Sequence, residues 1–353
     1  MAKTLRVGII GAGGIARGAH LPNYLKCGDK VKIVAVADVV QETANKLAED
    51  FDIPHVFMSY EEMFENVEID AVSICVPNKF HYNATITALR AGCHVLCEKP
   101  PAMSVNEAEE MRKEAEKAGK ILTYGFHFRH APQVEALKRF VEAGELGDIY
   151  ATRVTAMRRR GIPGWGVFTN KELQGGGPLI DIGVHMLDTA LYLMGYPEVD
   201  TVFGVTYQKL GTKQGVGLMG QWDYENFSVE DMARGMITFK NGSSLILESA
   251  FAANVEKADE MNVSLMGDRG GAELFPLTLF QEKHGTLVDI TPVHLPKKGF
   301  HELELERFVN ACLDGTQPIS TPEQGVIIQQ IINGLYESAE KGEAVKVSES
   351  VEI

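Results

Sequence analysis

The chain is poor in cysteine, and its cysteines lack the spacing of a redox or zinc site. It has five in 353 residues, an odd number, with no Cys-x-x-Cys pair among them. Disulfide frameworks use even numbers of cysteines and form in oxidising compartments, so this composition argues against one and favours a reducing cytoplasm. The segment 93–97 (Cys-His-Val-Leu-Cys) alternates like a buried strand, and we therefore predict a strand there and no metal site.

Long apolar runs and an excess of basic residues are also lacking. No run approaches the roughly 20 apolar residues of a membrane helix, and the first apolar stretch is too short for a signal peptide. The chain carries 48 acidic against 34 basic side chains, a formal net charge of -14. This balance argues against nucleic acid or an anionic membrane as a general partner. We therefore expect a soluble, cytoplasmic protein.

A glycine-rich turn is present near the N-terminus, directly after an apolar run at residues 5–10. The turn reads Gly11-x-Gly13-x-x-Ala16. Gly11 permits a tight turn, Gly13 lets the backbone approach a pyrophosphate, and Ala16 is small enough for a helix and a strand to pack closely. Because a helical segment follows, the phosphates of a dinucleotide would lie on the amides of its N-terminus.

A carboxylate at the end of a second apolar run strengthens this prediction. Residues 31–37 lead into Asp38, which lies 22 positions after Ala16, close to the spacing of a carboxylate that binds the adenosine ribose. Two valines follow in place of an arginine, so a 2′-phosphate would meet a negative charge. This favours NAD, with NADP as the alternative if an arginine arrives from elsewhere in the fold. The predicted cofactor-binding residues of this region are Gly11, Gly13, Gly14, Ile15, Ala16 and Asp38.

The sequence pattern changes near residue 126. Before that point, short apolar runs alternate with helical segments, which is typical of a parallel sheet wrapped by helices; beyond it, longer β-like stretches and glycine turns predominate. A chain of 353 residues also exceeds what one hydrophobic core usually spans. We predict an α/β chain, with a doubly wound parallel Rossmann sheet in residues 1–126 and an α+β domain with a large, mostly antiparallel open sheet in residues 127–353.

Individual elements follow from the same patterns. Ser104 with Glu107, and Thr321 with Gln324, have the spacing of a capping box at two helix starts, and an Asn-Gly pair at 241–242 predicts a hairpin turn. The expected strands are 5–10, 31–37, 71–76, 94–97, 121–124, 149–157, 231–239, 243–251 and 261–266, and the expected helices are 15–25, 105–118, 131–143, 178–194, 302–312 and 322–341.

Two predicted strands of the first half end in polar residues. Ligands of a parallel sheet bind beyond the carboxyl ends of its strands, so these two exits are candidate binding sites. Lys99 stands at one of them, where a lysine is costly unless its charge meets a substrate; a solvated loop lysine is the alternative. The predicted cofactor contacts at the two exits are Pro77, Asn78, His81, Glu98 and Lys99.

The predicted helix at 178–194 is apolar almost all round and should therefore be buried. Asp181, His185 and Asp188 nevertheless share one face of it, at positions i, i+4 and i+7. Such a stripe faces either a satisfied internal network or a cleft. Together with Lys99, Asp181 and His185 supply what alcohol oxidation needs: a cation for a developing alkoxide, a base, and a carboxylate that orients the base. We predict these three as catalytic.

A basic and aromatic segment at 158–165 offers substrate contacts. Arginine forks bind carboxylates or phosphates, and tryptophan stacks on a sugar face, so Arg160 and Trp165 are candidate substrate-binding residues. An exposed basic loop with one packed indole is the alternative. His127 and Arg129 also follow the last predicted Rossmann strand, but we assign them no role.

Three motifs in order resemble one family of oxidoreductases. The Gly11-x-Gly13-x-x-Ala16 turn, the Glu98-Lys99-Pro100 exit and the Asp181-x-Gly183-x-His185 helix are similar to those of the glucose-fructose oxidoreductase and inositol dehydrogenase (Gfo/Idh/MocA) family. The resemblance implies an NAD(P)-binding Rossmann domain and an α/β domain whose open sheet forms a homodimer or homotetramer interface. It also implies that the lysine, aspartate and histidine act on a sugar, sugar derivative or cyclitol.

The prediction is therefore an NAD(P)-dependent dehydrogenase or reductase acting on a CH–OH group. His185 would remove the hydroxyl proton and Lys99 would polarise the oxygen. Two alternatives use the same scaffold: a glycosidase that oxidises its sugar only transiently and keeps its NAD, and a sensor that binds the dinucleotide without turnover.

Overall fold

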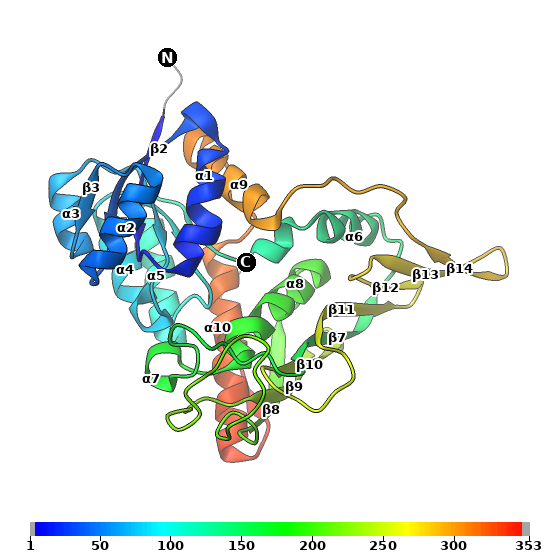
Figure 1. The fold of residues 1–353 in the computed structure, drawn as a ribbon. Helices are drawn as coiled ribbons and strands as arrows, with labels where there is room; N and C mark the ends of the chain where they lie inside the picture. The colour runs from blue at the N-terminus through cyan, green and yellow to red at the C-terminus, as the bar shows by residue number, and fades with distance from the viewer. Residues whose placement is uncertain (1–3, 348–353) are drawn as a thin grey trace. The chain divides into compact units, whose positions relative to one another are not determined.

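The computed structural model describes residues 4–347, which form two compact units. The first unit contains the chain up to His127 together with Lys298–Val326. The second unit contains Phe128–Lys297 together with residues 327–347. In Figure 1, which is coloured by residue number, the orange helix α9 comes late in the sequence and belongs to the first unit. Each unit is therefore built from two separate stretches of sequence.

The first unit is built on a six-stranded parallel sheet in the order β3-β2-β1-β4-β5-β6. This is the strand order of a doubly wound Rossmann sheet, so the predicted fold is confirmed. The short β3 was not predicted, since its three residues are only partly buried and leave little apolar pattern. The strands are β1 (Leu5–Ile10), β2 (Val31–Ala37), β3 (His55–Phe57), β4 (Ala71–Ile74), β5 (His94–Cys97) and β6 (Leu122–Tyr124).

Helices connect these strands, and their starts follow the sequence signals. The capping box at the start of α5 is present: the Ser104 hydroxyl accepts from the Glu107 amide, and the Glu107 carboxylate accepts from the Ser104 amide. The same reciprocal bonds join Thr321 and Gln324. The helices of this unit are η1 (Ala16–His20, a π turn), α1 (Leu21–Leu25), α2 (Gln41–Phe51), α3 (Tyr60–Asn66), α4 (His81–Arg90), α5 (Val105–Ala118) and α9 (Phe300–Asp314), with 3-10 turns η2 (Gly28–Lys30) and η3 (Asn78–Phe80).

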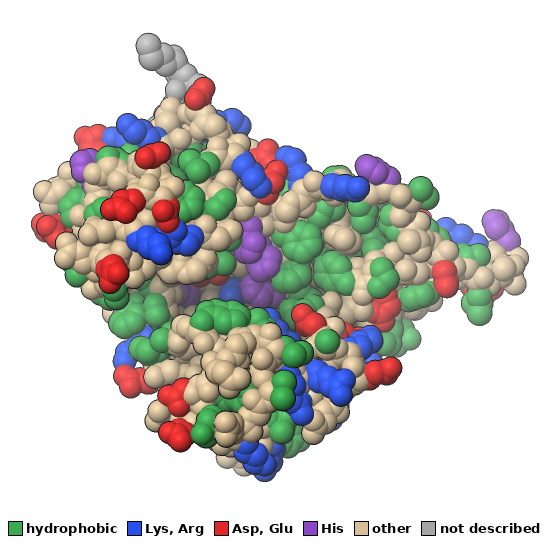
Figure 2. Space-filling model, in the orientation of Figure 1, with side chains coloured by type: hydrophobic (Ala, Val, Ile, Leu, Met, Phe, Trp, Pro, Cys, Tyr) green, Lys and Arg blue, Asp and Glu red, His purple; other side chains and the backbone are tan. Residues whose placement is uncertain are grey.

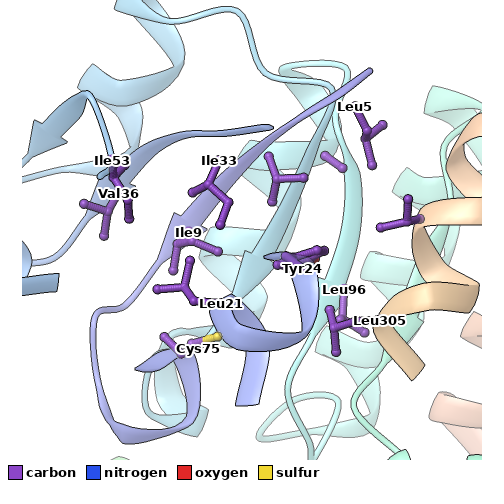
Figure 3. Packing of buried hydrophobic residues seen from close by; sticks show 14 of the residues in the cluster. Leu5, Ile9, Leu21, Tyr24, Ile33, Val36, Ile53, Cys75, Leu96 and Leu305 are labelled. Carbon is purple, nitrogen blue, oxygen red and sulfur yellow. The ribbon is translucent and has the colours of Figure 1, made fainter. Parts of the chain in front are cut away.

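The core of the first unit explains why α9 belongs to it. Leu305, Phe308 and Val309 of α9 are buried in one cluster with residues of β1, α1 and β5. Figure 3 shows Leu305 beside Leu96 of β5. The helix predicted at 302–312 is thus present, but it covers the Rossmann sheet. Burying the apolar face of a helix contributes about 25 cal/mol per Å² of apolar surface, which is what holds this distant segment in place.

The second unit is built on a nine-stranded sheet in the order β14-β13-β12-β11-β7-β10-β9-β8-β15. Among the described strands β7 and β10 pair in parallel and the other neighbours are antiparallel, which confirms the predicted mostly antiparallel sheet. Gly242 has a φ of 85° in the predicted hairpin turn. The strands are β7 (Ile149–Arg158), β8 (Val199–Tyr207), β9 (Met232–Phe239), β10 (Ser244–Ala250), β11 (Asp259–Gly267), β12 (Gly270–Glu273), β13 (Thr278–Lys283), β14 (Thr286–Ile290) and β15 (Val345–Lys346).

One face of this sheet is covered by helices, and the predicted helix at 178–194 is one of them. It begins as a π turn, η5 (Leu179–Gly183), and continues as α8 (Val184–Met194). Both pack on β7, where α8 also meets β11 and η5 meets β10. The remaining helices of the chain are η4 (His127–His130), α6 (Pro132–Glu142), α7 (Lys171–Gln174) and α10 (Pro322–Lys341).

The surface of the described residues carries both signs of charge. On the face shown in Figure 2, red and blue side chains are interspersed over both units. Among residues 4–347, none of the helices has the length and apolar character that crossing a bilayer requires.

Candidate active site

The glycine-rich turn lies where the strand order of the first sheet reverses, between β1 and β4. Gly11 has a φ of +95°, and a Cβ there would lie 2.6 Å from the Cys75 carbonyl oxygen at the end of β4. Only glycine fits this close approach. Gly13 and Gly14 are exposed, and Cβ atoms on them would meet nothing within 4 Å. The turn is therefore tight on the protein side and open on the other, as a backbone cradle for a pyrophosphate requires.

Asp38 lies beside this turn, at the end of β2. One carboxylate oxygen accepts from the Ala12 amide at 2.7 Å, and the other accepts from the Val40 amide at 2.8 Å. The side chain is half-buried, and each oxygen keeps a lone pair that can accept from a ribose hydroxyl. Arg17, on the helix after the turn, is paired with Asp50. The turn and this carboxylate together fit a dinucleotide.

The exit of β4 is joined to the exit of β5 by His81. Its Nδ1 lies 2.8 Å from the Pro100 carbonyl oxygen, and its Nε2 lies 3.0 Å from that of Val76. The ring is fully buried, and this burial lowers its pKa, although the two carbonyls oppose the shift. His81 thus fixes the two loops to one another through their backbones. Pro77 and the buried Asn78 begin the 3-10 turn that leads into it.

Glu98 and Lys99 leave β5 in contact with a histidine that the sequence analysis missed. His20 is fully buried; its Nε2 lies 2.9 Å from Glu98 Oε1, and its Nδ1 lies 2.9 Å from Ser73 Oγ. Burial alone would raise the pKa of Glu98, but the hydrogen bond and charge of His20 hold it well below its usual value. Lys99 is partly buried, and its peptide bond to Pro100 is cis. The position of His20 between the apolar residues Ala19 and Leu21 was the available signal.

Asp181 and His185 lie in the second unit, on the two parts of one helix. Asp181 is in the π turn and is half-buried, whereas His185 in α8 is 8% exposed. The ring of Phe128 lies 5.5 Å from the His185 ring, centroid to centroid, at a tilt of 55°. A hydrogen bond within the helix adds to this, since the Thr189 hydroxyl donates to the His185 carbonyl at 2.7 Å.

Asp188, the third member of the predicted stripe, belongs to an internal network. Arg129 donates to it through Nε at 2.7 Å and through Nη2 at 2.5 Å, and the Tyr196 hydroxyl donates at 2.8 Å. Arg129 and Asp188 are both fully buried. The expectation that all three residues of the stripe share one environment is therefore corrected: the alternative of a satisfied core network holds for Asp188.

The two candidate substrate-binding residues have different surroundings within the second unit. The Arg160 guanidinium donates to the Ala253 carbonyl at 3.0 Å and to Asn254 Oδ1 at 2.6 Å, so it ties two loops together. Trp165 is 53% exposed and meets Phe168 edge-on, with ring centroids 6.5 Å apart. Trp165 thus presents an accessible aromatic face.

Comparison with known proteins gives matches along nearly the whole chain. The sequence model GFO_IDH_MocA, described as an oxidoreductase family with an NAD-binding Rossmann fold, matches residues 5–126, and that of the family's C-terminal alpha/beta domain matches residues 138–347. Over 343 residues the chain is 46% identical to the D-glucoside 3-dehydrogenase of Escherichia coli (strain K12), with 97% of both proteins covered. It is 25% identical to the myo-inositol 2-dehydrogenase of Thermotoga maritima over 98% of this chain and 100% of that protein.

A solved structure shows the same fold. Levoglucosan dehydrogenase in complex with NADH matches with a TM-score of 0.85 and 22% identity, over 98% of this chain and 100% of that one. The fold class and the family resemblance predicted from the sequence are confirmed by these matches.

Proposed function

We propose that this chain, which belongs to the Gfo/Idh/MocA oxidoreductase family, transfers hydride between a secondary carbinol of a sugar and a nicotinamide cofactor. The observation that carries the proposal is the 46% identity over 97% of the chain to an enzyme named D-glucoside 3-dehydrogenase. A D-glucoside oxidised at a ring carbinol is accordingly the first candidate substrate. In this proposal the first unit binds the cofactor and the second unit recognises the sugar.

Each predicted catalytic residue has a role that its chemistry can perform. The nicotinamide ring supplies the hydride acceptor when the cofactor is bound. His185 removes the hydroxyl proton, Lys99 donates to the same oxygen and stabilises its developing negative charge, and Asp181 orients His185 or a neighbouring hydroxyl. Reduction of a keto-sugar uses the same three groups in reverse. Arg160 and Trp165 are our candidates for substrate recognition.

We propose NAD as the cofactor because Asp38 directly follows β2, where a ribose-binding carboxylate is expected, and Arg17 is paired with Asp50. The turn of Gly11, Gly13, Gly14, Ile15 and Ala16 would hold the pyrophosphate. Gly11, whose amide donates to the Ala37 carbonyl at 2.8 Å, shapes the turn, and the other four residues would offer their backbone amides. The exits that contain Pro77, Asn78, His81, Glu98 and Lys99 would flank the nicotinamide end.

Asp38→Ala is expected to raise the Kd for NAD about 10- to 100-fold, because hydrogen bonds to a charged acceptor contribute about 1.5–3 kcal/mol. The ratio of the Kd for NADP to the Kd for NAD should fall in the same variant, since the carboxylate that repels the 2′-phosphate is gone. Fluorescence titration with both cofactors measures this. The exposed Glu49 on α2 provides a matched control, because Glu49→Ala removes a carboxylate of the same unit away from the turn. An unchanged Kd for NAD in Asp38→Ala would rule out the ribose role.

We also propose that the chain forms a homodimer or homotetramer through the outer face of the nine-stranded sheet. Phe203, Met236 and Ile246 are direct cross-strand neighbours on β8, β9 and β10 and are 43%, 46% and 51% exposed. Arg234 and Glu248 form an ion pair in the adjacent row. An apolar row flanked by both signs of charge suits a second copy of the same surface, since a two-fold interface is self-complementary.

Ile246→Glu should therefore shift the chain to the monomer in sedimentation velocity, because it replaces an exposed apolar side chain of that row by a charge. Leu287→Glu is the matched control: Leu287 is 86% exposed on β14, at the far end of the sheet, and its variant should keep the parent mass. If Ile246→Glu sediments like the parent, the oligomer does not use this face.

The cytoplasmic location is proposed on the state of the thiols. All five cysteines are free, and four of them are buried. Burial raises the pKa of Cys93 to about 12, which keeps that thiol protonated and unreactive.

The test of the function is a panel of D-glucosides, aldoses and cyclitols incubated with NAD and monitored for NADH fluorescence. We expect NADH to accumulate with at least one D-glucoside. Release of free sugar from a glycoside without net NADH would indicate the transient-redox glycosidase. Tight NAD binding with no turnover of any compound would indicate the sensor.

A further inference from the structure

The helix that carries Asp181 and His185 starts on a buried carboxylate from a distant part of the chain. Its N-cap residue, Pro178, makes no side-chain capping bond. Glu230, which is 9% exposed and lies 53 residues from Gly177, accepts from the Gly177 amide at 2.9 Å and from the Leu179 amide at 3.2 Å. A carboxylate here satisfies amides that have no acceptor within the helix and meets the positive end of its dipole.

Tyr336 of α10 completes this arrangement. Its hydroxyl donates to Glu230 Oε1 at 2.8 Å. The two preceding glycines leave room for both groups: a Cβ on Gly176 would lie 2.0 Å from the Tyr336 hydroxyl oxygen, and one on Gly177 would lie 2.2 Å from the Glu230 carbonyl oxygen. Gly176 and Gly177 are therefore packing requirements of this helix start.

The sheet holds the same turn from a second direction. The Ser249 hydroxyl of β10 donates to the Pro178 carbonyl at 2.7 Å, and Gly183 passes close to Ser249, where a Cβ would lie 2.9 Å from the hydroxyl oxygen. Glu230 lies two residues before β9, the neighbour of β10, so the π turn that contains Asp181 is anchored to β10 and to the segment that leads into β9.

We propose that Glu230 is a positioning residue for the reaction: it fixes the first turn of the catalytic helix and thereby sets where Asp181 and His185 stand. This rests on the proposed function. Glu230 itself touches no reacting atom. Its contribution is to keep two catalytic side chains on a turn that would otherwise fray, and small displacements of such groups are costly to the rate.

The neighbouring carboxylate provides a matched control. Asp231 is also buried, and its Oδ2 accepts from the amides of Lys209, Leu210 and Gly211 at 2.6, 2.5 and 2.8 Å. Glu230 and Asp231 are thus adjacent buried acids that both cap backbone amides, but Asp231 caps a loop. Loss of the Asp231 carboxylate should destabilise the second unit to a comparable extent but leave the hydrogen bonds at the start of the catalytic helix in place.

The experiment compares Glu230→Gln, Asp231→Asn and the parent, each saturated with NAD. In Glu230→Gln the side-chain NH₂ group opposes one backbone N–H, so amide exchange across residues 177–183 should accelerate. The kcat should fall about 10- to 100-fold, with the sugar KM and the NAD Kd within about threefold of the parent. In Asp231→Asn exchange should accelerate at residues 209–211, with kcat within about twofold.

Two results would overturn the proposal: a kcat within about twofold of the parent in Glu230→Gln, or an equal loss in Asp231→Asn. If Glu230→Gln does not fold, the variant Tyr336→Phe is measured instead, since it removes one hydrogen bond to Glu230. An unchanged kcat in Tyr336→Phe counts against the proposal, and a reduced kcat supports it. Absence of NADH formation by the parent with every sugar is failure of the proposed function instead. The exchange rates at 177–183 then still report whether Glu230 holds the turn.

Discussion

His185→Ala is expected to lower kcat about 100- to 10,000-fold while leaving the Kd for NAD unchanged. A positioned general base contributes that range to proton transfer, and no other group in our assignment removes the hydroxyl proton. His185 lies in the second unit, whereas the dinucleotide turn and Asp38 lie in the first, so the cofactor contacts are not altered directly. Steady-state NADH formation with a D-glucoside and fluorescence titration with NAD measure the two quantities.

Two controls separate this effect from loss of structure. The first control is the thermal unfolding midpoint of the variant, which must match that of the parent. It is needed because His185 is 8% exposed and packs against Phe128, so its side chain also contributes to stability. His294→Ala removes an exposed histidine from the same unit and should leave kcat unchanged. If His185→Ala retained a rate within about tenfold of the parent, the base would have to be another residue.

Much of the fold was predictable because its signals are local. The apolar runs at β1 and β2 are buried on both faces of a parallel sheet and therefore read as continuous hydrophobic segments. The capping boxes at Ser104 and Thr321 are contained within four residues each. The short strand β3, the strands β8 and β12 to β15 of the second sheet, and the packing of α9 on the Rossmann sheet were missed. The strand β3 has little apolar pattern, and the packing of α9 depends on contacts between that helix and β1, which lie about 300 positions apart in the sequence.

The candidate site divides in the same way. Gly11, Gly13 and Asp38 form a motif that sequence alone identifies, because the spacing is set by one strand-turn-helix unit and the next strand. His20 and Glu230 were not found, since each acts on partners 51 or more residues away. Helical spacing placed Asp188 beside His185, but it could not show that Arg129, 59 residues away, forms an ion pair with the Asp188 carboxylate.

Arg129→Met is expected to destabilise the second unit by about 3–5 kcal/mol. Burial alone would lower the pKa of Arg129, but Asp188 raises it, so the guanidinium is charged and the two groups form a buried ion pair. Removing one partner leaves an uncompensated charge in the interior, and the desolvation of that charge is what destabilises the folded protein. Urea denaturation of Arg129→Met against the parent measures the loss.

The double variant Arg129→Met/Asp188→Leu should recover most of that loss, because replacing both charges by apolar groups of similar volume is close to neutral. The single variant should also become relatively more stable as the pH falls from 7 towards 5. Its lone buried Asp188 has a raised pKa in the folded state, so the folded protein holds a proton that the unfolded chain releases, and acid favours folding. A double variant as unstable as the single one, with no such pH dependence, would mean that Arg129 acts through packing on Tyr192 and Tyr196, whose rings lie 5.2 and 5.3 Å from its guanidinium carbon, and not through charge.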